Sequence, residues 1–367
     1  RAFSLAVSAP LPVIAVTGSV GKTTTKDMVA AVLGERWQVL KTEGNFNNNI
    51  GLPLTVLRLD RTVEMCVLEM GMNHAGEIDY LADIARPDVA LITNIGDCHI
   101  EYLGSREGIF RAKCEVFGHM DDKGVAILNG DDELLATLRG ALPMETVFTG
   151  MGSGLDYTAR DIETDGEGRM SCTIQTPRAA FRAHIPALGR HMVYPALMAA
   201  AVGERYGMTG EEIARGIANF LPTKMRMNVL RLPGDVTVLN DAYNANPQSM
   251  RAAATVLRDV PGARKVAVVG DMMELGDNSQ QFHYAVGECF GELGADCVIA
   301  VGQLAAAIAE GAREGGVARV LHFESLEEAM GTICGCLAPG TVILVKASRA
   351  MHFEKIVIAL ADAANRA

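Results

Sequence analysis

The chain has 367 residues, 49% hydrophobic and 21% charged, a balance typical of a globular protein long enough for two hydrophobic cores. Its formal net charge of −11 argues against a nucleic-acid-binding protein, which usually carries a basic surface. We find neither a signal peptide nor an apolar stretch of membrane-spanning length, so we expect a cytoplasmic protein without a membrane span.

Apolar runs and helical patterns alternate along the first part of the chain. Strands are predicted in PVIAV (12–16), VEMCVLEM (63–70) and DVALITNI (88–95). Each run is followed by a segment with helical spacing, namely KDMVAAVL, GEIDYLADIA and REGIFRAKCEVF. This alternation predicts a mostly parallel sheet with crossover helices.

The middle of the chain has a different pattern. Period-two alternation on both sides of the segment DGEG (165–168) predicts a small antiparallel hairpin within residues 155–187, and an alanine-rich helix follows it. A second α/β pattern then starts near residue 235, with apolar runs at 235–241, 265–271, 297–302 and 341–348.

The segment LPTKMRMNVL (221–230) is the expected joint between two domains. We predict a central domain of the P-loop type at residues 1–225, with a mostly parallel sheet and a small antiparallel part. A Rossmann-like C-terminal α/β domain is predicted at residues 226–367.

The segment TGSVGKTT (17–24) lies between the first predicted strand and the first predicted helix. It ends like the phosphate-binding loop GxxxxGK[ST], but Val16 replaces the first glycine and Gly18 opens a shorter loop. The glycines allow backbone N–H groups to face an anion, Lys22 adds a positive charge and Thr23 can offer its hydroxyl to Mg²⁺. The sequence therefore predicts a phosphate site, with a purely structural glycine turn as the alternative.

Polar residues follow the next two predicted strands. Glu69 ends one of them, Thr93 and Asn94 end the other, and His99 comes shortly after. Because ligands bind outside the carboxyl ends of parallel strands, we expect these residues at the same edge as the P-loop, where a carboxylate and an imidazole are plausible magnesium ligands. Taken singly, Glu69 could be a solvated strand end and His99 a structural loop histidine.

Several stretches together resemble the Mur ligase family, the ATP-dependent amide-bond ligases of peptidoglycan precursor synthesis. They are TGSVGKTTTK, TEGNFNNNIGLP, LEMGMNHAGEI, TNIGDCHIEYLGS, AKCEVF, DAYNANPQSM, GDMMELG and LVKASR. They occur in the order of the family and span nearly the whole chain. EMGMNHAGEI and AYNANPQSM resemble the branch that adds D-alanyl-D-alanine, whereas the other branches and folylpolyglutamate synthase share mainly the first loop.

The resemblance implies a ligase whose partners are ATP, a UDP-N-acetylmuramoyl-tripeptide and D-alanyl-D-alanine. ATP would phosphorylate the terminal carboxylate of the peptide to an acyl phosphate, and the amine of D-alanyl-D-alanine would displace the phosphate. Such phosphoryl transfer depends on positioning and on charge neutralisation. Two alternatives stay open: a related ligase that adds an amino acid to another carboxylate acceptor, and a non-catalytic nucleotide-binding module.

The resemblance also implies roles for individual residues. Lys22 would hold phosphates, and two Mg²⁺ ions are expected. The metal residues implied are Thr23, Glu69, His99 and Lys113. Lys113 matches the carbamylated lysine of the family, in which a carbamate supplies an anionic oxygen ligand; from composition alone it would be a surface helix lysine. The catalytic group implied is Lys22, Lys113, His99, Asn73 and His74.

Two further groups come from the same resemblance. The ATP-binding residues implied are Gly18, Ser19, Val20, Gly21, Lys22, Thr23, Thr24, Arg226, Asp241, Tyr243, Asn244 and Asn246. The substrate-binding residues implied are Asn45, Asn47, Asn48, Asp271, Lys346, Ser348 and Arg349. For these groups, asparagine-rich turns, helix capping, an interdomain salt bridge by Arg226 and solvated strand ends remain alternatives.

The sequence departs from the family in two places. Pro195 stands where the family has an adenine-reading asparagine, so that contact is lost or supplied by another residue. Family members also carry an N-terminal domain that holds the UDP part of the substrate, and no matching segment precedes the P-loop here. We therefore expect the chain to bind ATP and Mg²⁺ but to handle the UDP-linked acceptor poorly by itself.

Overall fold

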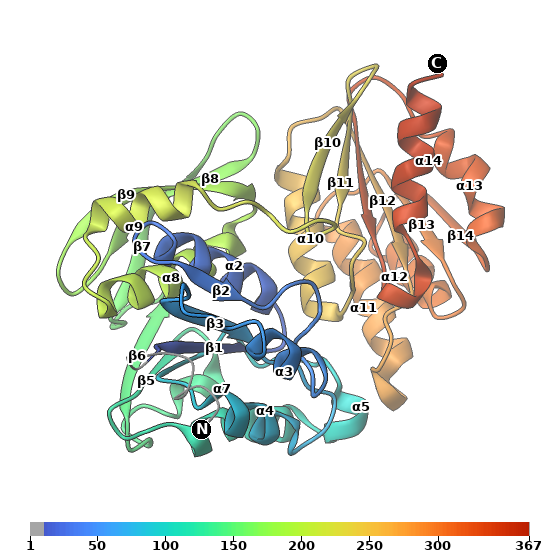
Figure 1. Cartoon of the computed structure of the whole chain (residues 1–367). Coiled ribbons are helices and arrows are strands. Elements are labelled where there is room, and N and C mark those ends of the chain that lie inside the picture. The colour runs from blue at the N-terminus through green and yellow to red at the C-terminus, as the bar shows by residue number, and fades with distance from the viewer. Residues whose placement is uncertain (1–10, 367) are drawn as a thin grey trace. The chain divides into compact units, whose positions relative to one another are not determined.

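The computed structural model describes residues 11–366, and these form two compact units (Figure 1). The first consists mainly of residues up to Leu221, and the second begins at Pro222 and also takes in Gly166–Gly168 and Ala187–Gly189. The units therefore meet in sequence inside the predicted joint at 221–230, while the domain boundary after residue 225 stays a prediction.

The first unit contains a nine-stranded sheet of order β2-β3-β1-β4-β5-β6-β7-β8-β9. The pairs from β2 to β7 are parallel and β7 pairs antiparallel with β8. The strands are β1 (Val13–Thr17), β2 (Val39–Lys41), β3 (Met65–Glu69), β4 (Val89–Ile92), β5 (Val125–Asn129), β6 (Glu145–Gly150), β7 (Tyr157–Thr164), β8 (Arg169–Gln175) and β9 (Ala180–Leu188).

Helices cover both faces of this sheet. They are α2 (Lys22–Leu33), α3 (Gly51–Val56), α4 (Glu77–Ala85), α5 (Ile100–Leu103), α6 (Arg106–Cys114), α7 (Glu133–Ala136), α8 (Val193–Arg205) and α9 (Gly210–Ala218), with short 3₁₀ turns η1 (Glu115–His119) and η2 (Arg190–Met192). Helix α2 packs against α8, α9 and the strands β1 and β3. The predicted hairpin is confirmed as β7 and β8, joined through Asp165–Gly168, and the alanine-rich helix is α8.

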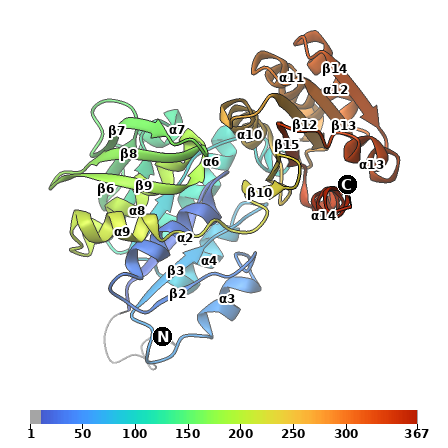
Figure 2. The same ribbon diagram turned by 90° about the horizontal axis from the view of Figure 1, so that it is seen from above.

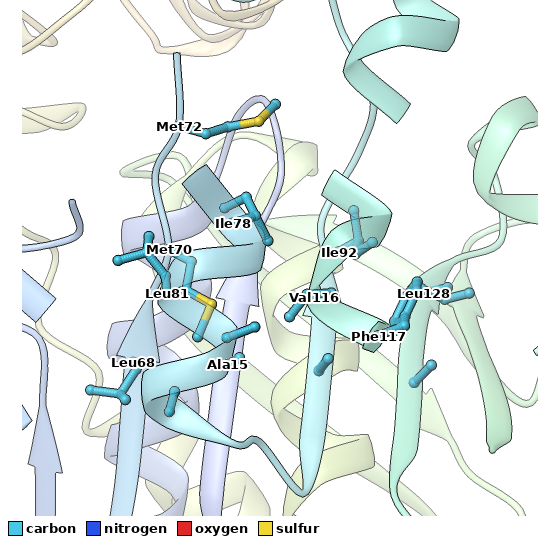
Figure 3. Close-up of a cluster of buried hydrophobic side chains, with 14 of the residues drawn as sticks. Ala15, Leu68, Met70, Met72, Ile78, Leu81, Ile92, Val116, Phe117 and Leu128 are labelled. Atoms are coloured by element: carbon cyan, nitrogen blue, oxygen red, sulfur yellow. The ribbon is translucent and has the colours of Figure 1, made fainter. Parts of the chain in front are cut away.

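The central strands are apolar on both sides, which explains why their sequences lack alternation. On one face, Ala15, Leu68 and Ile92 belong to a buried cluster that also includes Ile78 and Leu81 of α4 (Figure 3). Residues of α6 and η1, among them Val116 and Phe117, complete the same cluster. This core fixes β1, β3 and β4 beside one another, and these are the strands whose ends carry the predicted site.

The second unit contains a six-stranded sheet of order β10-β11-β15-β12-β13-β14, antiparallel only between β10 and β11. Its strands are β10 (Asn228–Leu232), β11 (Val236–Asn240), β12 (Arg264–Gly270), β13 (Cys297–Val301), β14 (Arg319–Phe323) and β15 (Thr341–Lys346). Its helices are α10 (Pro247–Asp259), α11 (Ser279–Glu292), α12 (Ala305–Glu314), α13 (Leu326–Cys334) and α14 (Glu354–Ala364), with short turns η3 (Gly276–Asn278) and η4 (Arg349–Met351).

Two apolar layers sandwich this second sheet. Helices α10, α11 and α12 contribute to one buried cluster, and α13 and α14 contribute to the other (Figure 2). The predicted fold class, a mostly parallel α/β unit with a small antiparallel part followed by a Rossmann-like α/β unit, is confirmed. None of the helices within residues 11–366 has the length and apolar character needed to cross a bilayer.

Candidate active site

The carboxyl ends of β3, β1 and β4 lie side by side at one edge of the first sheet. Val16 of β1 is in register with Glu69 of β3, and Thr17 is in register with Ile92 of β4. The strand pairing therefore places the P-loop, Glu69 and the segment after β4 together, which is the edge where open parallel sheets bind ligands.

The P-loop has the backbone conformation that its two glycines allow. Gly18 has φ +140°, and a Cβ there would lie 1.9 Å from Oγ1 of Thr93. Gly21 has φ +85° and precedes α2, whose N-terminus has neither a side-chain cap nor an acidic residue in its first turn. Because the first N–H groups of a helix have no intrahelical acceptor, this end of α2 suits a bound anion.

Lys22, the first residue of α2, folds back over the loop. Its Nζ donates to the carbonyl oxygens of Gly18 at 2.8 Å and of Ser19 at 3.4 Å. An ammonium group has three donors, and these contacts place its positive charge directly beside the loop. Thr24 is half-buried in the same first turn.

Thr23 and Glu69 are in contact, as a shared metal site requires. The Thr23 hydroxyl donates to Oε1 of Glu69 at 3.2 Å, and Nδ2 of Asn47 donates to the same oxygen at 2.8 Å. Glu69 is only 2% exposed, and its Oε2 has no hydrogen-bond partner in the described part of the chain. A buried, unsatisfied carboxylate oxygen beside a hydroxyl is a donor set that fits Mg²⁺.

Glu69 is held from behind by a pair of residues that sequence analysis did not single out. Its backbone N–H donates to the Thr42 hydroxyl at 2.9 Å, and the Thr42 carbonyl accepts from Nζ of Lys26 at 2.6 Å. Lys26 is 2% exposed and forms an ion pair with Asp27 at 3.1 Å. Its position four residues after Lys22, on the same side of α2, was the available signal.

Lys113 is buried inside the unit rather than on its surface. It lies in α6 and is 1% exposed. Burial, with a smaller contribution from the positive charge of Lys22, lowers the pKa of Lys113 to about 7, while Cys98 acts in the opposite direction. In a large fraction of the protein molecules Lys113 is therefore a neutral amine near neutral pH, which is the form that reacts with CO₂.

His99 belongs to the segment between β4 and α6. It is half-buried, has φ +63° and directly precedes α5. No group of three His, Cys, Asp or Glu side chains within residues 11–366 could hold a metal by itself. A site built on Glu69 and His99 therefore needs the Thr23 hydroxyl, a modified Lys113 or ligand oxygens to complete it.

The three predicted asparagines of the asparagine-rich loop make different contacts. Asn47 contacts Glu69, as described, and Oδ1 of Asn48 accepts from the N–H groups of Ile50 and Gly51 at the start of α3. Asn45 is exposed. The structure thus brings one of the three to the candidate metal carboxylate and gives another a capping contact.

Asn73 and His74 lie just before α4. The backbone N–H of Asn73 donates to Glu77 at 2.7 Å, and the His74 ring lies 3.6 Å from Glu77 and 4.7 Å, centroid to centroid, from Tyr102. Both residues are exposed. Neither side chain caps α4, whose N-cap residue is Gly76, and the proposed catalytic role of the two residues stays a prediction.

In the second unit, two of the predicted ATP-binding residues, Asp241 and Asn244, contact Lys346. Its Nζ donates to Asp241 and, at 2.9 Å, to the carbonyl of Asn244, while the other oxygen of Asp241 accepts from Met227 N–H at 3.1 Å. Arg226 lies 4.2 Å from the Tyr243 ring, a cation–π contact, and its Nε is buried without a hydrogen-bond partner among the described residues. Lys346, predicted on the substrate side, thus joins the predicted nucleotide group.

The other predicted residues of this unit have structural contacts. Asn246 caps α10 by accepting from Ser249 N–H at 2.8 Å. The buried carboxylate of Asp271 accepts from Ala305 N–H at 2.7 Å at the start of α12, and Ser348 accepts from Met273 N–H at 3.0 Å. Their assigned ligand roles stay predictions.

Two further predicted positions are also placed by the structure. Arg349 pairs with Glu354 at 3.1 Å. Pro195 lies in the first turn of α8, where a missing N–H breaks no helical bond. The replacement of the family asparagine by proline is therefore compatible with the helix.

The fold and the P-loop at residues 17–24 define a P-loop protein with a Rossmann-like second unit. Known proteins narrow the class further. Residues 16–203 match the model of the Mur ligase middle domain, and residues 225–349 match the model described as "Mur ligase, glutamate ligase domain". The chain belongs to the Mur ligase family.

Curated relatives cover nearly the whole chain. The UDP-N-acetylmuramoyl-tripeptide–D-alanyl-D-alanine ligase of Bacillus subtilis (strain 168) is 43% identical over 94% of this chain and 75% of that protein. The enzyme of the same name from Escherichia coli (strain K12) is 37% identical over 96% of this chain and 77% of that protein. The chain thus spans about three quarters of these relatives.

Two solved structures have the same fold. A crystal structure of MurF from Acinetobacter baumannii superposes with a TM-score of 0.89 at 38% identity, covering 96% of this chain and 77% of that one. MurF ligase from Thermotoga maritima in complex with ADP has a TM-score of 0.86 at 30% identity, covering 97% of this chain and 81% of that one. These similarities support the fold of each unit.

Proposed function

We propose that this chain is the ATP-dependent ligase that joins D-alanyl-D-alanine to the terminal carboxylate of a UDP-N-acetylmuramoyl-tripeptide, in peptidoglycan precursor synthesis. The identity to ligases of that name supports this function. The structural observation that carries it is the contact between Thr23 of the P-loop and the buried, half-satisfied carboxylate of Glu69.

The proposed reaction has two steps. The acceptor carboxylate attacks the γ-phosphorus of ATP, the bond to the β-phosphate oxygen breaks, and ADP and an acyl phosphate result. The amine of D-alanyl-D-alanine then attacks the acyl carbon and loses a proton, and inorganic phosphate leaves with the electrons of the C–O bond. ATP is needed because a free carboxylate is a poor electrophile.

The residues of the first unit would serve this reaction as follows. The amides at the start of α2 and the ammonium of Lys22 would bind the β- and γ-phosphates. Thr23 and Glu69 would hold one Mg²⁺, and His99 with a carbamylated Lys113 would hold a second. Bound magnesium would neutralise charge on the transferred phosphoryl group. Asn73 and His74, which lie after β3, and Asn45, Asn47 and Asn48 would face the acceptor.

Arg226, Asp241, Tyr243 and Asn244 would contact the nucleotide from the second unit. Asp271, Ser348 and Arg349 are proposed for the D-alanyl-D-alanine side, Asn246 for the nucleotide loop and Lys346 for either. The cytoplasmic location also stays a proposal.

The test is phosphate release measured with ATP, Mg²⁺ and the UDP-linked tripeptide. D-alanyl-D-alanine should support release, whereas single amino acids such as D-alanine or glutamate should not, and the B. subtilis relative serves as the positive control. Release with a single amino acid would favour a related ligase. No release with any acceptor, even after the uncovered part of the B. subtilis relative is added, would favour a binding module.

The same assay tests whether the chain handles the UDP-linked acceptor poorly by itself. The part of the B. subtilis relative that the alignment leaves uncovered is added as a separate polypeptide. A higher rate is expected with it, and equal rates would contradict that expectation.

The carbamate on Lys113 is tested by mass spectrometry under native conditions with and without bicarbonate. The wild-type protein should gain the mass of one CO₂, and Lys113→Met should not gain it. An unmodified wild-type protein that retains full turnover would contradict this assignment.

A further inference from the structure

The backbone N–H and C=O of Val20, at the tip of the P-loop, are hydrogen-bonded by two side chains from the segment after β4. Oδ1 of Asn94 accepts from Val20 N–H at 2.9 Å, and Nδ2 of Asn94 donates to Val20 O at 3.0 Å. The Thr93 hydroxyl donates to the same carbonyl at 2.6 Å. We call these three hydrogen bonds of Thr93 and Asn94 the loop clamp.

Neighbouring contacts extend the loop clamp to Ser19. The Ser19 N–H donates to the backbone carbonyl of Asn94 at 3.0 Å, and the Ser19 hydroxyl accepts from Gly96 N–H at 2.9 Å. The tip of the loop, residues 19 and 20, is therefore held to residues 93–96 by these five hydrogen bonds. The flanking glycines supply flexibility, and the clamp removes it.

This pairing decides which amides can meet an anion. The N–H groups of Ser19 and Val20 already donate to Asn94, so they are directed away from any phosphate. The N–H groups that follow, from Gly21 into the first turn of α2, lie beyond the clamp. A shortened loop with two amides committed elsewhere needs its remaining amides held in one arrangement, because a donor displaced by even a fraction of an ångström weakens a charge-assisted hydrogen bond.

We propose that Thr93 and Asn94 are positioning residues, which set the P-loop amides for the triphosphate and keep the loop in register with the candidate metal residue His99. This inference rests on the proposed function. His99 follows Asn94 on the same segment, and the intervening Cys98 lies 3.5 Å from the Ser19 carbonyl. The clamp therefore connects the part of the site that binds phosphate with the part that holds a metal.

The test compares nucleotide affinity and turnover in four variants of the 367-residue chain. Asn94→Leu removes both side-chain bonds, and Asn94→Asp keeps only the acceptor. Thr93→Val removes the hydroxyl in an isosteric side chain, and Thr93→Ser restores it. The dissociation constant of ADP with Mg²⁺ should rise about 10- to 100-fold in Asn94→Leu and about 3- to 10-fold in Thr93→Val. Thr93→Ser should remain near wild type.

A matched control separates positioning from general stability. The Thr176 hydroxyl is buried, donates to Glu204 at 2.7 Å and accepts from Ala179 N–H at 2.9 Å in a different part of the unit, so Thr176→Val removes buried hydroxyl hydrogen bonds away from the loop. This control should lower the melting temperature without changing ADP affinity. In the clamp variants the KM for ATP should rise, while the KM for D-alanyl-D-alanine should stay constant.

Each outcome decides one question. The inference would be overturned if Asn94→Leu bound ADP as tightly as the wild-type protein, or if its ADP affinity equalled that of Thr176→Val. Either result would leave the proposed function intact. A wild-type chain that binds no nucleotide would overturn the proposed function instead. The clamp is then judged by amide hydrogen exchange at Val20, which should become faster in Asn94→Leu. If Asn94→Leu does not fold, the Thr93→Val and Thr93→Ser pair gives the answer.

Discussion

The ammonium group of Lys26 lies 2.6 Å from the backbone carbonyl of Thr42, whose hydroxyl in turn accepts the N–H of Glu69. This chain of contacts connects the middle of α2 to the candidate metal carboxylate. It supports Glu69 through the backbone, and it therefore limits the positions that the carboxylate can take. A buried lysine is costly, and the contact explains why one is present here.

Lys26→Met is expected to destabilise the protein by about 1–3 kcal/mol, because it removes a buried ion pair and the hydrogen bond to Thr42. Turnover should also fall, since Glu69 loses its support. Lys41→Met is the matched control: Lys41 pairs with the same Asp27 at 2.7 Å but is 42% exposed, so its loss should cost only about 0–1 kcal/mol. Urea unfolding measures both, and equal losses would contradict the role of Lys26.

Glu69→Gln is expected to stabilise the metal-free protein by about 1 kcal/mol while it abolishes magnesium-dependent turnover. The wild-type carboxylate has one buried oxygen without a partner, and the amide removes that charge without changing its shape. Thermal unfolding with and without Mg²⁺ and ADP is the measurement. Magnesium should raise the melting temperature of the wild-type protein only, so an equal rise in the variant would show that Glu69 is not a ligand.

Gly18→Ala should abolish nucleotide binding and destabilise the protein by about 1–3 kcal/mol. The residue has φ +140°, and its new methyl group would lie 1.9 Å from Oγ1 of Thr93. Gly166→Ala in the β7–β8 turn serves as the control, because a Cβ there meets nothing within 4 Å. We expect its melting temperature and ADP affinity to stay at wild-type values. Normal ADP binding by Gly18→Ala would disprove the loop geometry.

The stability of the second unit should fall in mild acid because of His283. Its Nε2 accepts from Met272 N–H at 2.8 Å and its Nδ1 lies 2.7 Å from the Ser279 carbonyl, so the buried ring is neutral. Burial lowers its pKa below the usual 6.5, although the nearby carboxylate of Asp271 acts in the opposite direction.

The lowered pKa of His283 decides how stability changes with pH. A lowered pKa in the folded state means that stability is fully present above pH 6.5 and is lost as the pH falls, by at most about 1.4 kcal/mol per pH unit. His283→Gln lacks this titration. Unfolding free energies at about pH 7.5 and about pH 5.5 should therefore differ more in the wild-type protein than in the variant. The same pH dependence in both would contradict the assignment.

Much of the fold could be predicted because its signals are local. Apolar runs such as Val13–Thr17, glycines at the P-loop and the turn at Asp165–Gly168 each reflect the preferences of a few neighbouring residues. Parallel strands also bring their carboxyl ends to one edge, so the meeting of the P-loop with Glu69 followed from the strand pattern alone. The family motifs added the proposed reaction.

The amino-acid sequence by itself thus determined the strand and helix pattern and the family, and it predicted a phosphate-binding loop. Only the tertiary structure decided that Lys113 is buried with a lowered pKa, that Asn47 contacts Glu69, and that Lys26 supports it. It also showed that Thr93 and Asn94 hydrogen-bond to the P-loop and that Asp271 accepts a hydrogen bond from the start of α12. The physical reason is that burial and side-chain hydrogen bonds depend on residues far apart in sequence, which come together only when the sheets form.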